Sequence, residues 1–160
     1  MGFRRKIFNA VFGWHAKGGR QDPVREEAEK KLLELPYEEL NILSHDGLKL
    51  YGMLFINEGS DRFVILNHGY NSYGMKDHSN TALRYYEEGY TVLMPDNRGA
   101  GKSEGNFQGF GIFESRDNLL WFDYLKNRFG GVSSDGRTGL TAAMTMTTST
   151  PTPIQARTPK

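Results

Sequence analysis

Two short strings in this 160-residue chain hold the residue types that could do chemistry. The first is His68-Gly69-Tyr70, which follows directly on an expected buried strand at 63–67. A glycine at a strand end lets the backbone turn sharply and leaves N–H groups free, and such groups can stabilise an oxyanion. The competing interpretation is an ordinary strand-to-helix turn, in which His68 bonds only to nearby backbone.

The second string runs from Asp96 to Ser103, and its last three residues are Gly-Lys-Ser. A phosphate-binding P-loop ends in the same three residues, but it has a glycine at the position that Asp96 occupies here. A carboxylate at that position would repel a phosphate. The motif also needs a helix that begins at the serine and supplies aligned donors, whereas residues 104–109 continue as loop. A P-loop-like nucleotide-binding domain is therefore kept only as an alternative function.

Ser103 also completes a literal G-x-S-x-G over residues 101–105. A serine nucleophile in that pattern lies on a tight turn from strand to helix. Ser103 lies well beyond its strand in a long glycine-rich loop, so we do not expect it to be a nucleophile. Residues 131–136 fit no better, because Asp135 stands where the second glycine belongs.

The elements that would position both strings follow from hydrophobic periodicity and turn signals. Asp22 and Pro23 mark the start of a helix whose apolar stripe begins at Val24, and Asp46-Gly47 is a hairpin turn signal. The expected elements are a helix at 22–35, strands at 40–44, 48–56 and 63–67, a helix at 77–88, a strand at 91–94 and a helix at 113–128. This order predicts the opening of a doubly wound α/β sheet, whose ligand sites lie at the carboxyl ends of its strands.

Composition excludes several classes of protein. The chain has no cysteine, which excludes disulfides, thiolate zinc sites and a cysteine nucleophile. Its net charge of +1 gives no reason to expect a nucleic-acid partner. The apolar stretch within residues 1–20 is too short to span a bilayer, so a helix there either packs on the domain or lies on a membrane surface. We expect no metal, no cofactor and a cytoplasmic location, with peripheral membrane contact as the alternative.

Together the two strings resemble the α/β-hydrolase superfamily, and most of all its bacterial serine-hydrolase branch of esterase- and peptidase-like proteins. The resemblance covers residues 36–130 and rests on a strand entering His-Gly-Tyr, then a helix, then a strand entering Pro-Asp-x-Arg-Gly-x-Gly-x-Ser-x-Gly. It implies that Tyr70 donates its backbone N–H to an oxyanion hole and that His68 and Gly69 shape that loop. It also implies that internal bonds hold the second loop through Asp96, Arg98, Gly99, Gly101 and Ser103.

The chain departs from that family where the catalytic triad should appear. The resemblance implies that the serine follows a strand beginning near residue 132 and that the acid and the histidine come later still. His15, His45, His68 and His78 all lie too early, so no nucleophile, acid or base has a matching position. We therefore expect an incomplete α/β-hydrolase fold in a truncated chain. Such a chain would be inactive on the small-molecule ester, amide or peptide substrates of the intact family.

Three segments follow from this interpretation. Residues 1–35 form an N-terminal helical segment and residues 36–130 the N-terminal portion of an α/β-hydrolase domain. Residues 131–160 are rich in Thr, Ser, Ala, Gly and Pro and read as a disordered, non-native tail. Without a following strand, strand 63–67 would present an unpaired apolar edge. An interaction module that offers this edge to a partner chain is therefore a further alternative.

Overall fold

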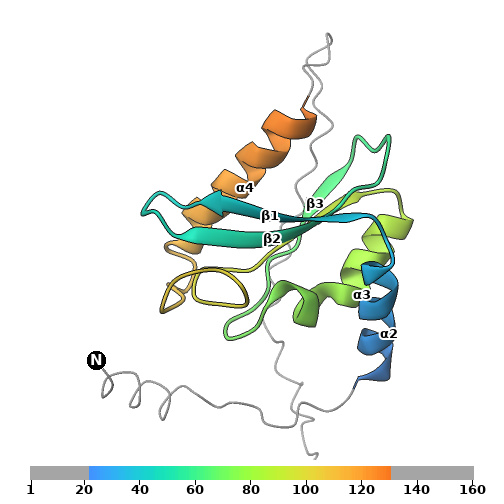
Figure 1. The fold of residues 1–160 in the computed structure, drawn as a ribbon, viewed down its shortest axis with the longest axis horizontal. Helices are drawn as coiled ribbons and strands as arrows, with labels where there is room; N and C mark the ends of the chain where they lie inside the picture. Colours follow the sequence, from blue (N-terminus) through green and yellow to red (C-terminus); the bar gives the residue numbers. More distant parts are fainter. Residues whose placement is uncertain (1–21, 131–160) are drawn as a thin grey trace, which may run out of the picture.

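The computed structural model describes residues 22–130, which build three helices and four strands (Figure 1). In chain order these are α2 (Pro23–Leu33), β1 (Tyr37–Leu43), β2 (Lys49–Phe55), β3 (Phe63–Ile65), α3 (Gly74–Glu87), β4 (Thr91–Pro95) and α4 (Glu114–Phe129). Each element expected within this range is present, and the largest shifts are three residues: β1 begins at Tyr37 rather than at residue 40, and α3 begins at Gly74 rather than at residue 77. The helix expected within residues 1–20 and the tail expected at 131–160 lie outside the described residues.

The strands form one mixed sheet in the order β1-β2-β4-β3. The strands β1 and β2 are an antiparallel hairpin in which Leu43 pairs with Lys49, and the turn between them contains Gly47 at a φ of +84°. Glycine adopts this left-handed conformation without steric cost, which explains the Asp-Gly signal. The strand β4 pairs antiparallel with β2 and parallel with β3. The predicted α/β fold class, a hairpin followed by β-α-β-α units, is confirmed.

Different helices cover the two faces of the sheet (Figure 1). On one face α2 and α3 contribute Leu32 and Ala82 to a core that includes Val64 of β3. On the other face α4 contributes Trp121 and Leu125, each about 1% exposed, to a second core. The strand β4 lies between the two cores and is buried along its whole length. A continuous apolar run is the pattern expected of such a strand.

The helix α2 begins as its sequence predicts but packs differently. The side chain of Asp22 accepts hydrogen bonds from the backbone N–H groups of Val24 and Arg25, at 3.2 and 3.3 Å. The expected apolar stripe is wrong at its first position, because Val24 is 65% exposed while Ala28 and Leu32 are buried. Only the later turns of α2 lie against the core, so the first turn has no apolar surface to cover.

The strand β3 lies at the border of the described sheet. Within residues 22–130 it pairs with β4 alone. Its side chains are nonetheless buried, since Phe63 and Ile65 pack with α4 and are 6% and 5% exposed. No helix in the described part of the chain is long and apolar enough to cross a membrane.

Candidate active site

A cleft of about 910 Å³ opens at the carboxyl ends of β3 and β4. A doubly wound sheet binds its ligands at this position. One wall is the loop after β3 together with the first turns of α3, and the other wall is the loop before α4 together with the start of α4. The lining residues are Asn67, His68, Gly69, Tyr70, Asn71, Ser72, Lys76, Asp77, Asn97, Gln108, Phe110, Gly111, Glu114 and Asn118.

Three consecutive backbone amides of the loop after β3 differ in their partners. Gly69 N donates to Asp77 Oδ2 at 2.9 Å, and Asn71 N donates to Gln108 Oε1 at 2.8 Å. Between them, the N–H of Tyr70 has no acceptor among residues 22–130. Two flanking side chains thus fix the loop and leave one donor free, at a position that lines the cleft. A fixed, unpaired backbone N–H is the group that an oxyanion requires.

His68 joins the two loops, and its hydrogen bonds select one tautomer of the neutral ring. Its Nε2 accepts the backbone N–H of Asn97 at 2.9 Å, so the ring proton is on Nδ1, which donates to the carbonyl oxygen of Gly69 at 2.7 Å. The side chain of Asn97 donates in turn to the carbonyl oxygen of His68. Burial lowers the pKa of His68, because the charged imidazolium would lose its hydration. With both ring nitrogens occupied, His68 shapes the loop as a neutral group and has no free lone pair to act as a base.

Asp96 closes the second loop on itself. Its Oδ1 accepts the N–H of Gly74, at the start of α3, and its Oδ2 accepts the N–H of Lys102, both at 2.9 Å. Gly101 passes so near that a Cβ there would lie 1.9 Å from Asp96 Oδ2, at a φ of +51°. Gly99 is similarly constrained, since its Cβ would lie 2.9 Å from the carbonyl oxygen of Phe107 at a φ of +71°. Only glycine fits at either position.

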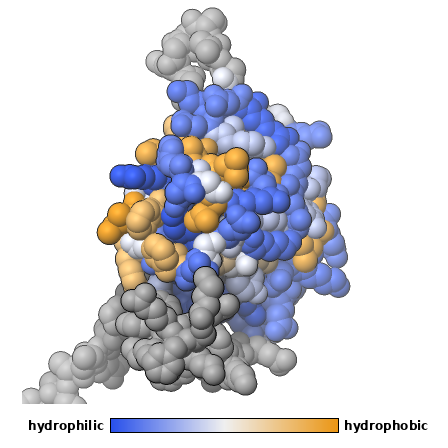
Figure 2. All heavy atoms as spheres, turned by 60° about the vertical axis from the view of Figure 1, so that its left-hand side comes forward, coloured by the Kyte–Doolittle hydropathy of each residue, from blue (hydrophilic) through white to orange (hydrophobic). Residues whose placement is uncertain are grey.

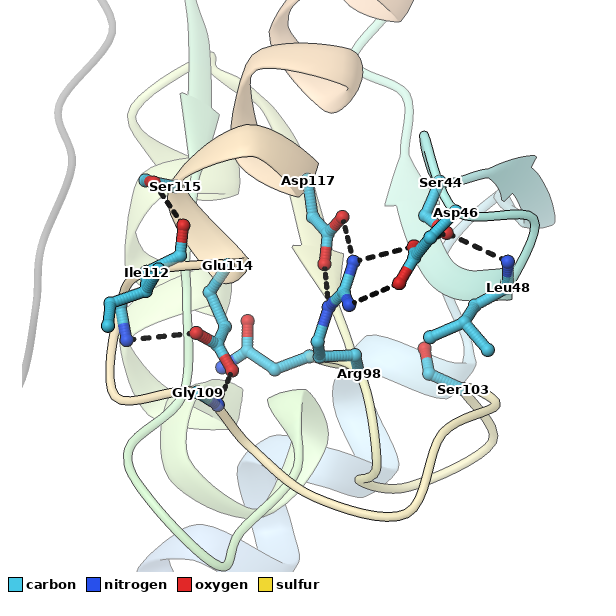
Figure 3. Close-up of polar contacts among 12 residues, drawn as sticks. Ser44, Asp46, Leu48, Arg98, Ser103, Gly109, Ile112, Glu114, Ser115 and Asp117 are labelled. Atoms are coloured by element: carbon cyan, nitrogen blue, oxygen red, sulfur yellow. Dashed lines mark hydrogen bonds and ion pairs between the residues drawn. The ribbon is translucent and has the colours of Figure 1, made fainter.

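Arg98 connects the hairpin turn, the second loop and α4 (Figure 3). Its guanidinium donates to both carboxylate oxygens of Asp117 at 2.7 and 2.8 Å, and to both of Asp46 at 2.9 and 3.0 Å. The ring of Phe113 lies 5.0 Å from the guanidinium carbon. The two carboxylates raise the pKa of Arg98, and the guanidinium holds the pKa of Asp46 well below its usual range. Arg98 therefore stabilises the fold by linking these three segments, and it does not line the cleft.

Ser103 and Lys102 are committed to structural bonds. Ser103 Oγ donates to the carbonyl oxygen of Asp96 at 2.6 Å and accepts the N–H of Tyr51 at 2.8 Å. Lys102 Nζ lies 2.6 Å from Glu39 Oε1 and donates to Tyr51 Oη at 3.1 Å. Burial raises the pKa of Tyr51 to about 12, and these partners raise the pKa of Lys102. In the described chain the first helix after Ser103 is α4, which begins at Glu114, so the P-loop alternative lacks its helix N-terminus.

A buried amide lines the cleft without a partner. Asn67 is 6% exposed, and neither polar atom of its side chain has a hydrogen-bond partner among the described residues. Leaving such a group unsatisfied costs about 1–3 kcal/mol, so native structures tolerate it mainly where a further polar group enters.

Three residues that shape the cleft were not predicted as site residues from the sequence. Asp77 was expected only as the start of a helix, although its carboxylate holds both Gly69 N and Ser72 Oγ. Gln108 and Glu114 were not singled out, because their roles depend on how the 97–113 loop folds back. Glu114 is 8% exposed and accepts the N–H groups of Gly109 and Gly111. An acidic residue in a first helical turn was the one available signal for Asp77 and Glu114.

The chain is similar to proteins of known class, although no family model matches it. The esterase Pf2001 of Pyrococcus furiosus is 33% identical, with a TM-score of 0.58 over 69% of this chain and 42% of that one. The thiohydrolase aneE of Aspergillus aculeatus is 35% identical over 72 residues, which are 45% of this chain and 23% of that protein. An α/β hydrolase of Vibrio vulnificus is 19% identical with a TM-score of 0.57, which supports the fold alone.

These matches cover only part of each longer protein. The chain spans less than half the length of each of these relatives. The chain is similar to esterase-like proteins of the α/β-hydrolase superfamily and matches part of longer hydrolase chains.

Proposed function

We propose that residues 36–130 form the oxyanion-loop half of a serine-hydrolase site that acts on small carboxylic esters or thioesters. The observation that carries the proposal is the free N–H of Tyr70, held between two bonded amides at the edge of the cleft. This donor would stabilise the negative charge that develops on the carbonyl oxygen during attack. The relatives above 30% identity are named an esterase and a thiohydrolase, which favours esters and thioesters over amides and peptides.

The nucleophile half of such a site is not found among the described residues. A serine nucleophile must donate its proton to a histidine within hydrogen-bond reach. Each of the six serine hydroxyls in residues 22–130 donates to a carboxylate or a carbonyl oxygen instead; these serines are Ser44, Ser60, Ser72, Ser79, Ser103 and Ser115. We propose that His68 and Ser103 are structural and that these residues alone do not hydrolyse esters.

A serine-reactive fluorophosphonate and amide hydrogen exchange test the proposal together. We expect no covalent label on Ser103, because its hydroxyl is bonded on both sides. We also expect fast exchange at Tyr70 N–H and slow exchange at the amides of Gly69 and Asn71. A label on Ser103 would overturn the assignment of the loop, and slow exchange at Tyr70 would overturn the oxyanion donor.

The open border of β3 supports an interaction module as a second candidate function. Within the described chain β3 has one neighbouring strand, and unpaired strand edges are templates for pairing with another chain. Analytical ultracentrifugation of the chain tests it, since edge pairing predicts self-association or a stoichiometric partner. A monomer at all concentrations, with no copurified chain, would remove this candidate.

A further inference from the structure

Two aromatic residues from different loops meet at the cleft. The rings of Tyr70 and Phe110 stack, with centroids 4.8 Å apart and an interplanar angle of 14°. Both residues line the cleft, yet Tyr70 is 46% exposed and Phe110 is 80% exposed. A stacked pair that is this open has ring surface left for a third flat group.

The loop that presents Phe110 is held in a costly conformation. Phe110 has a φ of +51°, in the left-handed region that side chains rarely adopt. Both neighbouring amides, Gly109 N and Gly111 N, donate to the carboxylate of Glu114, the second of them at 2.9 Å (Figure 3 shows Glu114 beside this loop). Because strain persists only where the surroundings hold it, strained residues cluster at functional sites. Here the strained backbone of Phe110 places its apolar ring in solvent.

The loop that presents Tyr70 is built in the same way. Its flanking amides are bonded to Asp77 and Gln108, and Gln108 comes from the loop that carries Phe110. Two bonded amides therefore flank each ring, and the bond from Asn71 to Gln108 ties the two loops together. The stack is thus a fixed part of the cleft wall.

The surroundings of the stack are suited to an apolar group. The carboxylates of Asp77 and Glu114, which also line the cleft, are both turned onto backbone donors. The same loop exposes three further apolar side chains, since Phe107, Ile112 and Phe113 are 54%, 71% and 36% exposed. Figure 2 shows hydrophobic side chains exposed among hydrophilic ones on the face that it displays. Patches of this kind mark binding sites.

We propose that the Tyr70–Phe110 pair is the specificity platform of the cleft and binds the planar aromatic portion of an aryl ester or thioester. The inference rests on the proposed function, because the backbone N–H of Tyr70 would hold the carbonyl of the same molecule. A flat ring extends an offset stack and loses few internal rotations on binding, whereas a flexible alkyl chain loses more. Size agrees, because the cleft of about 910 Å³ accepts a drug-sized ligand.

A pair of ketones tests the platform on the full chain without any catalysis. The probe 2-acetonaphthone is a flat ketone analogue of an aryl ester, and cyclohexyl methyl ketone is an apolar analogue with no flat ring. Titration followed by NMR should show that the chain binds the naphthyl ketone about tenfold more tightly, as expected for one aromatic stack. Phe110→Ala should remove most of this preference, and Phe110→Trp should restore it.

Two further variants test whether binding depends on the Tyr70–Phe110 pair and on the loop that holds Phe110, and not on exposed apolar side chains elsewhere. Leu43→Ala removes an apolar side chain that is 70% exposed on β1 and should leave both affinities unchanged. Glu114→Gln releases the loop and should weaken naphthyl binding even though both rings remain. Equal affinity for the two ketones, no binding, or unchanged binding by Phe110→Ala overturns the platform. If the naphthyl ketone binds more tightly but the Tyr70 amide resonance does not shift, the result supports the platform. The same result counts against Tyr70 N–H as the oxyanion donor.

Discussion

Arg98→Met tests how much the buried ion pair between Arg98 and Asp117 contributes to the stability of the fold. Arg98 and Asp117 have side chains that are 5% and 6% exposed, and they share two hydrogen bonds. Methionine fills much of the volume of arginine but leaves the Asp117 carboxylate buried without its partner. Breaking a buried pair in this way costs about 3–5 kcal/mol, which is a large part of the about 5–15 kcal/mol that stabilises a domain.

Equilibrium unfolding in urea, followed by circular dichroism, measures this loss. The double variant Arg98→Met/Asp117→Asn should lose less stability than Arg98→Met alone, because it also removes the orphaned charge. Lys31→Met is the matched control, since it breaks the exposed pair with Glu27 and should leave the midpoint unchanged. A loss below about 1 kcal/mol for Arg98→Met, the range of an exposed ion pair, would refute the reasoning.

Three further predictions concern the loop residues. Gly101→Ala should unfold at a lower temperature by differential scanning calorimetry, because its Cβ would meet Asp96 and the left-handed backbone adds about 1–2 kcal/mol; an unchanged melting temperature contradicts this. The lowered pKa of His68 means that its neutral form stabilises the fold above about pH 6.5 and that this stability falls as pH decreases, by at most about 1.4 kcal/mol per pH unit. His68→Gln should therefore flatten the pH dependence of the urea midpoint between pH 8 and 5, and an unaltered slope would remove the argument. Ser103→Ala should cost about 1–3 kcal/mol by leaving Tyr51 N–H unpaired, and neither the original chain nor the variant should hydrolyse an ester; hydrolysis by the original chain that Ser103→Ala abolishes would make Ser103 catalytic.

Local sequence signals predicted the elements well where one interaction decides the conformation. Asp22 caps α2, and Gly47 turns the hairpin with a positive φ. The apolar run of β4 is buried on both faces. The failures occur where tertiary packing decides, as at Val24, which lies on the predicted stripe but beyond the surface that α2 covers.

The site was predictable in part for the same reason. Adjacent residues with a known backbone geometry, such as His68-Gly69-Tyr70, placed the first loop at the cleft. The bonds that immobilise the loop come from distant positions, since Gln108 reaches Asn71 across 37 residues and Arg98 reaches Asp46 across 52. No periodicity encodes such contacts, because they depend on how an irregular loop folds back on the sheet.

The amide resonance of Tyr70 tests most directly whether its backbone N–H is an oxyanion donor. Titration of the full chain with 2-hexanone, a small ketone analogue of an ester, should move the Tyr70 amide proton downfield in a saturable way as it bonds to the carbonyl oxygen. The amides of Gly69 and Asn71 should move little, because their acceptors are already Asp77 and Gln108. A saturating titration that leaves the Tyr70 amide unmoved would contradict the account.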